Sequence, residues 1–199
     1  DRCVMTFNNT VLNTHNPRLI FVREICFRKC MLLSADCADV LCRLVNLEYL
    51  DISFTKIYTI GTFKTLRWLK ELICDSVARI NKESAEGIEE CPRLHTLDIS
   101  HTQLMYDGCR ELLSKSKSLC NLRACCEDLN RVDLTGMESI IEVDISNRGR
   151  FYRWRDSDDD EDDADNSDHD YETFHPLDTP HLKGMTNLRT LAMNKSSMF

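Results

Sequence analysis

Long apolar runs are missing from this 199-residue sequence, which has no stretch of 18 consecutive apolar residues. A helix that crosses a membrane needs about 20 such residues, so the sequence excludes a membrane-spanning helix within this stretch. A signal peptide ahead of residue 1 is not tested by this observation. Glycine is also scarce, with six residues, and the sequence shows neither a glycine-rich phosphate-binding loop nor a nucleophile elbow.

Cysteine pairs at the C-x-x-C spacing of zinc and redox sites are absent as well. The nearest groupings of reactive side chains are Cys91 with His95 and Asp98 with His101. Neither grouping has further partners at a recognisable spacing for a metal site or an activated nucleophile. The sequence therefore predicts a protein that is not an enzyme, with no catalytic residue, no metal site and no cofactor.

What the sequence does contain is a repeated phrase. LEYLDISFTKI begins at Leu47, and the similar LHTLDISHTQL begins at Leu94. The apolar template of these phrases recurs with its central position at Met5, Ile25, Leu50, Leu72, Leu97, Leu122, Val143 and Leu191. Successive steps are 20 to 25 residues, except for a last step of 48. A period of 20 to 29 residues is typical of leucine-rich repeats.

Each copy pairs strand periodicity around its central residue with a period of three to four in the stretch leading into it. One such unit cannot bury its own apolar face, so neighbouring units must stack. We expect an α/β solenoid of about eight repeats, curved like a horseshoe, with a parallel sheet on its concave face and helices or turns on its convex face. The stretches KESAEGIEECPRL and YDGCRELLSKSKSL should each add a helix.

Small polar or thiol side chains follow the strand in several copies, namely Thr10, Cys30, Thr55, Thr102 and Ser196. We expect them to hydrogen-bond to the backbone of an adjacent turn. The domain boundaries follow from the repeat pattern. Residues 1–150 should hold leucine-rich repeats, 151–175 a disordered acidic insertion, and 176–199 the final repeat of the same array. The pattern runs from residue 1 to Phe199 without a polar cap, so we expect a fragment of a longer array.

The insertion is strongly acidic: ten of the fifteen residues from Asp156 to Asp170 are Asp or Glu, in a chain of net charge −8. Such a run should stay disordered. It could also be phosphorylated at Ser157 or Ser167, or capture a basic partner such as a histone. A calcium loop is disfavoured because the glycine and final glutamate are missing. The arginines and aromatics just before the run do not predict nucleic-acid binding, because the acidic run would repel phosphate.

The eleven cysteines are an odd number, and many occupy core positions of the repeat. This usage suits buried thiols in a reducing compartment better than a disulfide framework. We therefore expect a cytoplasmic or nuclear protein.

Polar positions within and just after each strand should point to the concave surface, because side chains alternate across a strand. This surface should bind a protein partner that carries basic or hydrogen-bonding groups, with no role for nucleic acid or membrane, and the chain should be monomeric. The predicted partner-binding residues are Tyr49, Asp51, Phe54, Asp75, Asp98, His101, Arg123 and Asp144.

The chain resembles the cysteine-containing and ribonuclease-inhibitor-like classes of the leucine-rich-repeat superfamily. The phrases LVNLEYLDISFTKI and LHTLDISHTQL look most like the leucine-rich region of Zyg/Zer-type substrate receptors of cullin-2 ubiquitin ligases. This resemblance implies an interaction scaffold within a cullin-RING ligase. It also implies contacts with elongin and cullin-2 through regions outside this chain.

Two other classes of protein share the scaffold. Acidic leucine-rich nuclear proteins, which act as histone chaperones or phosphatase regulators, also join a repeat array to an acidic run. Their acidic run is a terminal tail, whereas here the array resumes from Leu182 to Met198. Stoichiometric binders that resemble tropomodulin or ribonuclease inhibitor are the third possibility.

Overall fold

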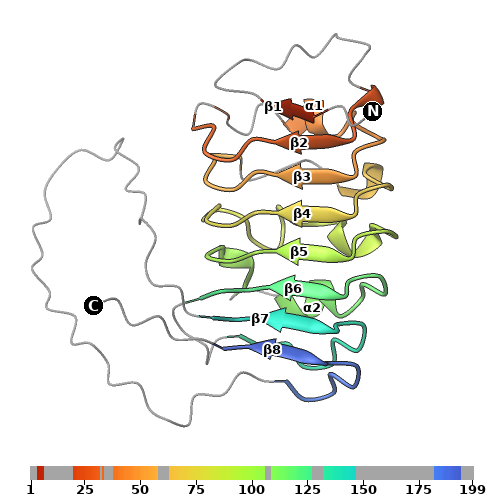
Figure 1. Cartoon of the computed structure of the whole chain (residues 1–199), viewed down its shortest axis with the longest axis vertical. Helices are drawn as coiled ribbons and strands as arrows, with labels where there is room; N and C mark the ends of the chain where they lie inside the picture. The colour runs from red at the N-terminus through yellow and green to blue at the C-terminus, as the bar shows by residue number, and fades with distance from the viewer. Residues whose placement is uncertain are drawn as a thin grey trace, which may run out of the picture.

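A computed structural model describes residues 4–6, 20–31, 33, 38–57, 63–105, 109–126, 132–146 and 182–193. Eight short parallel strands form one sheet, in which each strand pairs with the next one along the chain (Figure 1). The strands are β1 (Val4–Thr6), β2 (Glu24–Cys26), β3 (Tyr49–Asp51), β4 (Glu71–Ile73), β5 (Thr96–Asp98), β6 (Asn121–Arg123), β7 (Glu142–Asp144) and β8 (Thr190–Ala192). This sequential order is the architecture of a repeat solenoid.

The register of the sheet follows the repeat template. The central template residues pair with one another across all seven strand pairs, from Met5 with Ile25 to Val143 with Leu191. Six of them are 0–2% exposed in the interior of the array, namely Ile25, Leu50, Leu72, Leu97, Leu122 and Val143. The predicted parallel sheet and its eight repeat positions are therefore confirmed.

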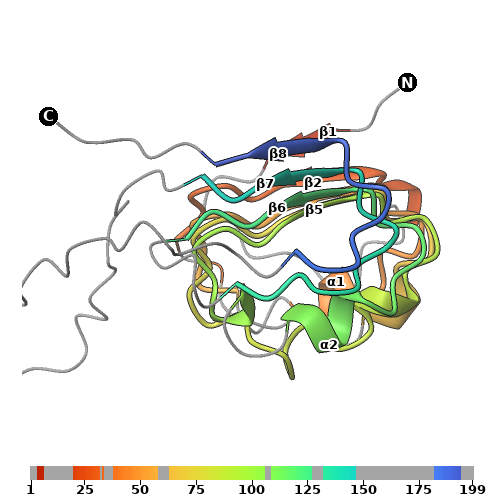
Figure 2. The same ribbon diagram turned by 90° about the horizontal axis from the view of Figure 1, so that it is seen from below.

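Short helices form a second layer across the core from the sheet (Figure 2). They are α1 (Ala38–Leu41), η3 (Phe63–Thr65), η4 (Ile88–Glu90), η5 (Gln103–Met105) and α2 (Cys109–Leu113), the η elements being 3-10 helices. The predicted helix in YDGCRELLSKSKSL is present as α2. In the described parts of the chain, no helix has the length and apolar character that a membrane span requires.

The helix expected in KESAEGIEECPRL is reduced to the single 3-10 turn of η4, so that prediction was wrong in extent. Asn81 and Ser84 accept hydrogen bonds from each other's backbone N–H groups at 2.9 Å, a reciprocal pattern that begins a helical turn, and the N–H of Ala85 bonds to the carbonyl of Asn81 at 3.1 Å. Gly87 then adopts a left-handed conformation with φ 92°, which an α-helix cannot contain. The chain therefore turns where the prediction placed a helix.

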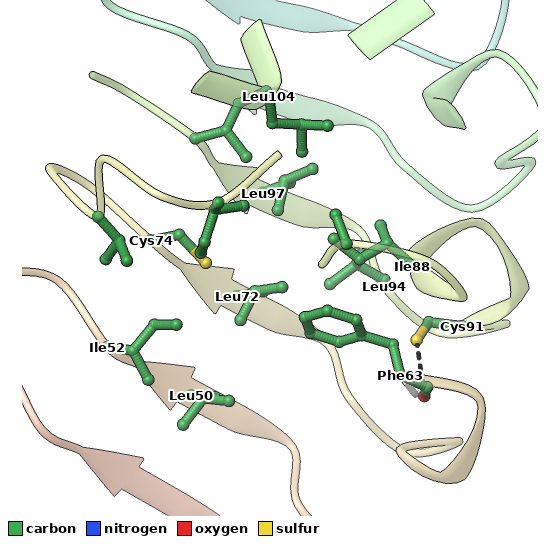
Figure 3. Packing of buried hydrophobic residues seen from close by; sticks show 14 of the residues in the cluster. Leu50, Ile52, Phe63, Leu72, Cys74, Ile88, Cys91, Leu94, Leu97 and Leu104 are labelled. Atoms are coloured by element: carbon green, nitrogen blue, oxygen red, sulfur yellow. Dashed lines mark hydrogen bonds between the residues drawn. The ribbon is translucent and has the colours of Figure 1, made fainter. Parts of the chain in front are cut away.

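The core lies between the two layers and includes several thiols (Figure 3). Cys91 contacts the carbonyl oxygens of Phe63 and Gly87 through its Sγ atom at 3.5 and 3.6 Å. Burial raises the pKa of Cys91 and of Cys109 to about 12, so both thiols are protonated at neutral pH. The nine cysteines in the described residues are thiols outside any disulfide, and six of them are buried.

The array continues across the 48-residue step. β7 and β8 are paired in register, the N–H of Arg189 bonds to the carbonyl of Ile141 at 2.8 Å, and the N–H of Gly136 bonds to the carbonyl of Lys183 at 2.8 Å. The predicted insertion at 151–175, with Ser157 and Ser167, lies outside the described residues. The segment assigned to the final repeat nevertheless contains the eighth strand.

Candidate functional site

An aspartate ends three of the strands. The Oδ1 atom of Asp51 accepts a hydrogen bond from the N–H of Ser53 at 2.9 Å, and Asp98 and Asp144 bond in the same way to Ser100 and Ser146 at 3.0 Å. Asp51 and Asp98 are only 4% and 8% exposed. These carboxylates therefore fix the turn after the strand and add little to the accessible surface. Contact between them and a partner stays a prediction.

Four residues just after the strands share a left-handed backbone. They are Lys29, Phe54, Ser76 and His101, with φ values of 56–63°. Each donates its backbone N–H to a carbonyl of the next repeat, as Phe54 does to Asp75 at 3.0 Å and His101 to Cys125 at 2.9 Å. The row of these four residues, the left-handed row, thus extends the hydrogen-bond ladder beyond the three-residue strands.

The threonines after the left-handed row bond within their own turns. Thr55 donates its hydroxyl to the carbonyl of Ile52 at 2.7 Å, and Thr102 does the same to Ile99 at 2.7 Å. The expectation that these side chains bond to an adjacent turn is therefore corrected for Thr55 and Thr102. The reason is that the backbone of the left-handed row already supplies the bonds between repeats.

Phe54, which follows the C-terminal end of β3, lies beneath cationic side chains. The guanidinium carbon of Arg28 is 5.0 Å from the centre of the Phe54 ring, and the same guanidinium lies 3.8 Å from Asp51. Burial, reinforced by the Asp51 charge, raises the pKa of neighbouring Tyr49 to about 12. The structure therefore gathers three of the predicted site residues, Tyr49, Asp51 and Phe54, around one arginine that the prediction did not include.

The other predicted residues continue along the sheet. The register places Arg123 between Asp98 and Asp144, and Arg123 is exposed. Asp75 and His101 are half-buried, and Asp75 accepts the hydroxyl of Ser76 at 3.0 Å. The predicted residues thus follow one track across β3 to β7, although not all of them are equally accessible.

The prediction overlooked the first position of the strands. Its column runs through Glu24, Tyr49, Glu71, Thr96, Asn121 and Glu142, and every member is half-buried or exposed. Only Tyr49 was predicted from this column. Strand alternation was the available signal, because the residues on either side of a buried central residue share the outer face. Three glutamates in the column make this face acidic.

The protonation of Asp98 gives a test of its role. Burial raises the pKa of Asp98, against the opposing effect of its hydrogen bonds with Ser100. Folding therefore favours the protonated carboxyl of Asp98. The stability that this protonated group contributes is fully present below the pKa of the unfolded state, and it is lost as the pH rises through the pKa of the folded state. Asp98→Asn keeps an acceptor for Ser100 but carries no charge. As the pH is raised from about 3 to 7, the free energy of unfolding of Asp98→Asn should increase relative to that of the wild type. Urea unfolding at each pH measures this difference.

Asp133 offers a matched control of opposite sign. It bonds to the N–H of Thr135 at 2.9 Å in the same way. Partial burial acts to raise its pKa, but the Thr135 bonds and the Arg110 charge outweigh that effect and lower the pKa. Asp133→Asn should therefore lose stability relative to the wild type over the same pH range. Parallel pH profiles for the two variants would contradict the assigned environment of Asp98.

Comparison with known proteins finds no family model that matches this chain and no curated protein sequence that matches it. Within the described residues, no group of three or more His, Cys, Asp or Glu side chains is placed to hold a metal ion.

Proposed function

We propose that this chain is a leucine-rich-repeat array that binds another protein on the outer face of its sheet. The observation that carries the proposal is the row of accessible side chains across β2 to β7, with Glu24, Glu71 and Glu142 in one register column. Such a surface suits an extended partner segment that carries basic or hydrogen-bonding side chains. Phe54 and Tyr49 supply aromatic anchors of the kind that dominate interface energetics.

The more specific proposal is that the array is the leucine-rich region of a substrate receptor of a cullin-RING ubiquitin ligase. Its support is the repeated phrase with threonine after the strand, as in LEYLDISFTKI. In this role the chain would be a non-enzymatic scaffold of the cytoplasm or nucleus, where buried free thiols such as Cys74 and Cys91 are stable. Elongin and cullin-2 would bind regions outside this chain.

Affinity capture from cell lysate with quantitative mass spectrometry tests the proposal. The baits are the wild-type chain, Phe54→Ala, Glu71→Lys, and the control Glu83→Ala, whose side chain is exposed outside the sheet. We expect a discrete partner to be lost by about tenfold or more with Phe54→Ala and Glu71→Lys and retained with Glu83→Ala. Elongin or cullin-2 among the captured proteins would support the ligase role.

A deletion of residues 156–170 separates the main alternative. If histones or other basic proteins dominate the wild-type capture and disappear with this deletion, while Phe54→Ala has no effect, the acidic run is the binding element. That result would overturn the proposal for the sheet and favour a histone chaperone or a phosphatase regulator.

A further inference from the structure

Exposed apolar side chains gather at one edge of the array. Among the described residues, six large hydrophobic side chains are exposed, and four of them are Ile20, Phe21, Val45 and Trp68, with exposures of 46%, 69%, 45% and 42%. These four lie in the turns that lead into β2, β3 and β4, at the tails of the arrows in Figure 1. We call them the entry-turn patch. A cluster of exposed apolar side chains on three successive repeats is a typical mark of a binding surface.

The members of the patch are connected through the backbone and a shared hollow. Asn46 donates its side-chain N–H to the carbonyl of Ile20 at 2.7 Å, which ties the first entry turn to the second. A hollow of about 480 Å³ then joins the second turn to the third, lined by Val45, Asn46, Lys64, Thr65, Arg67 and Trp68. Its volume is enough for a large side chain of a partner.

Positive charge continues from the patch along the same edge. In the entry turns before β4, β5 and β6, exposed basic residues lie one or two positions before the core leucines Leu69, Leu94 and Leu119, namely Arg67, Arg93 and Lys117. The Arg93 guanidinium stacks on Trp68, with 3.8 Å between its central carbon and the ring centre. No described ion pair involves Arg67, Arg93 or Lys117. The apolar patch therefore passes directly into a row of cations.

We propose that the entry-turn patch binds an extended peptide segment of a partner protein, with one or two large apolar side chains on the patch and carboxylates on Arg67, Arg93 and Lys117. Adjacent repeats are about 4.8 Å apart and an extended chain rises about 3.3 Å per residue. Five repeats from Phe21 to Lys117 therefore match about six residues. This site is distinct from the outer face of the sheet and goes beyond the function proposed for that face.

Fluorescence anisotropy with the full chain and a defined probe tests this site. The probe is a fluorescein-labelled peptide with Phe-Leu followed by Asp-Glu-Asp, used together with its reversed sequence. Control peptides replace either the acidic residues with Lys or the apolar residues with Ser. We expect saturable binding of an acidic probe, weakened about tenfold or more by Trp68→Ser and by Arg67→Glu combined with Arg93→Glu. Phe54→Ala should bind the probe as the wild type does, which separates this site from the sheet face.

Several results would overturn the proposal. These are equal binding of the lysine peptide, absence of saturable binding for every acidic probe, or wild-type affinity in the Trp68→Ser and double-arginine variants. Concentration-dependent dimerisation that Trp68→Ser abolishes would instead assign the patch to a second copy of the chain. Urea unfolding checks that each variant is folded, and the double-arginine variant carries the test if Trp68→Ser does not fold, because both arginines are exposed.

Discussion

Phe63→Ala is expected to lower the free energy of unfolding by about 3–5 kcal/mol, the range for removing a buried aromatic ring. Phe63 is 1% exposed and begins η3, and its ring faces the core near Leu72 (Figure 3). Its backbone also accepts the contact from Cys91 Sγ, so the residue joins two neighbouring repeats. The loss can be measured by urea unfolding monitored by far-ultraviolet circular dichroism.

Phe21→Ala is the matched control for this prediction. Its ring is 69% exposed, and exposed substitutions usually change stability by less than about 0.5 kcal/mol. The same chemical change should therefore have effects that differ by several-fold between the two positions. A loss of less than about 1 kcal/mol for Phe63→Ala would show that the ring is not packed in the core as described.

Gly87→Ala is expected to destabilise the chain by about 2–5 kcal/mol. Part of this, about 1–2 kcal/mol, comes from the left-handed conformation at φ 92°, which disfavours a side chain. The remainder comes from close approach, because an added Cβ would lie 3.1 Å from the backbone nitrogen of Lys64 and 3.3 Å from that of Phe63. The backbone of η3 would have to shift, and such overpacking typically costs about 1–3 kcal/mol.

Gly136→Ala separates the two contributions. Gly136 has a similar φ of 78°, but a Cβ there would have no neighbour within 4 Å. Gly136→Ala should therefore show the conformational cost alone, about 1–2 kcal/mol. Thermal unfolding of both variants gives the comparison. Equal losses for the two substitutions would mean that the entry of η3 relaxes freely, and that the close packing of Gly87 against it contributes nothing.

The apolar period of the sequence was enough to predict the sheet. Leu50, Leu72 and Leu97 mark the centres of three strands, and the structure pairs them directly. A slip of one residue in the strand pairing would turn each buried leucine to the outer face. The apolar template therefore determines the register of the sheet. The same reasoning overestimated the helix in KESAEGIEECPRL, because the left-handed conformation of Gly87 is a local feature that apolar spacing does not encode.

The candidate site was predicted only in part, for a related reason. Alternation correctly places Asp51 and Asp98 on the side of the strand away from the central leucines. Alternation does not encode the turn that follows each of these strands. In that turn, each carboxylate accepts a hydrogen bond from the backbone N–H of the serine two residues later. The entry-turn patch was missed because the spacing of the core leucines marks Leu66 and Leu69 as buried and assigns no role to Trp68 between them.

Because β7 pairs directly with β8, we expect that residues added to the sequence between these two strands change the free energy of unfolding little. The entropy of closing a loop grows slowly, by about 0.6 kcal/mol for each doubling of its length. Among the described residues, the bonds from Arg189 to Ile141 and from Gly136 to Lys183 join the last repeat to the one before it. A fluorescent or affinity domain inserted between residues 151 and 175 should therefore leave the stacking intact, which makes this connection an attachment point for biophysical reporters.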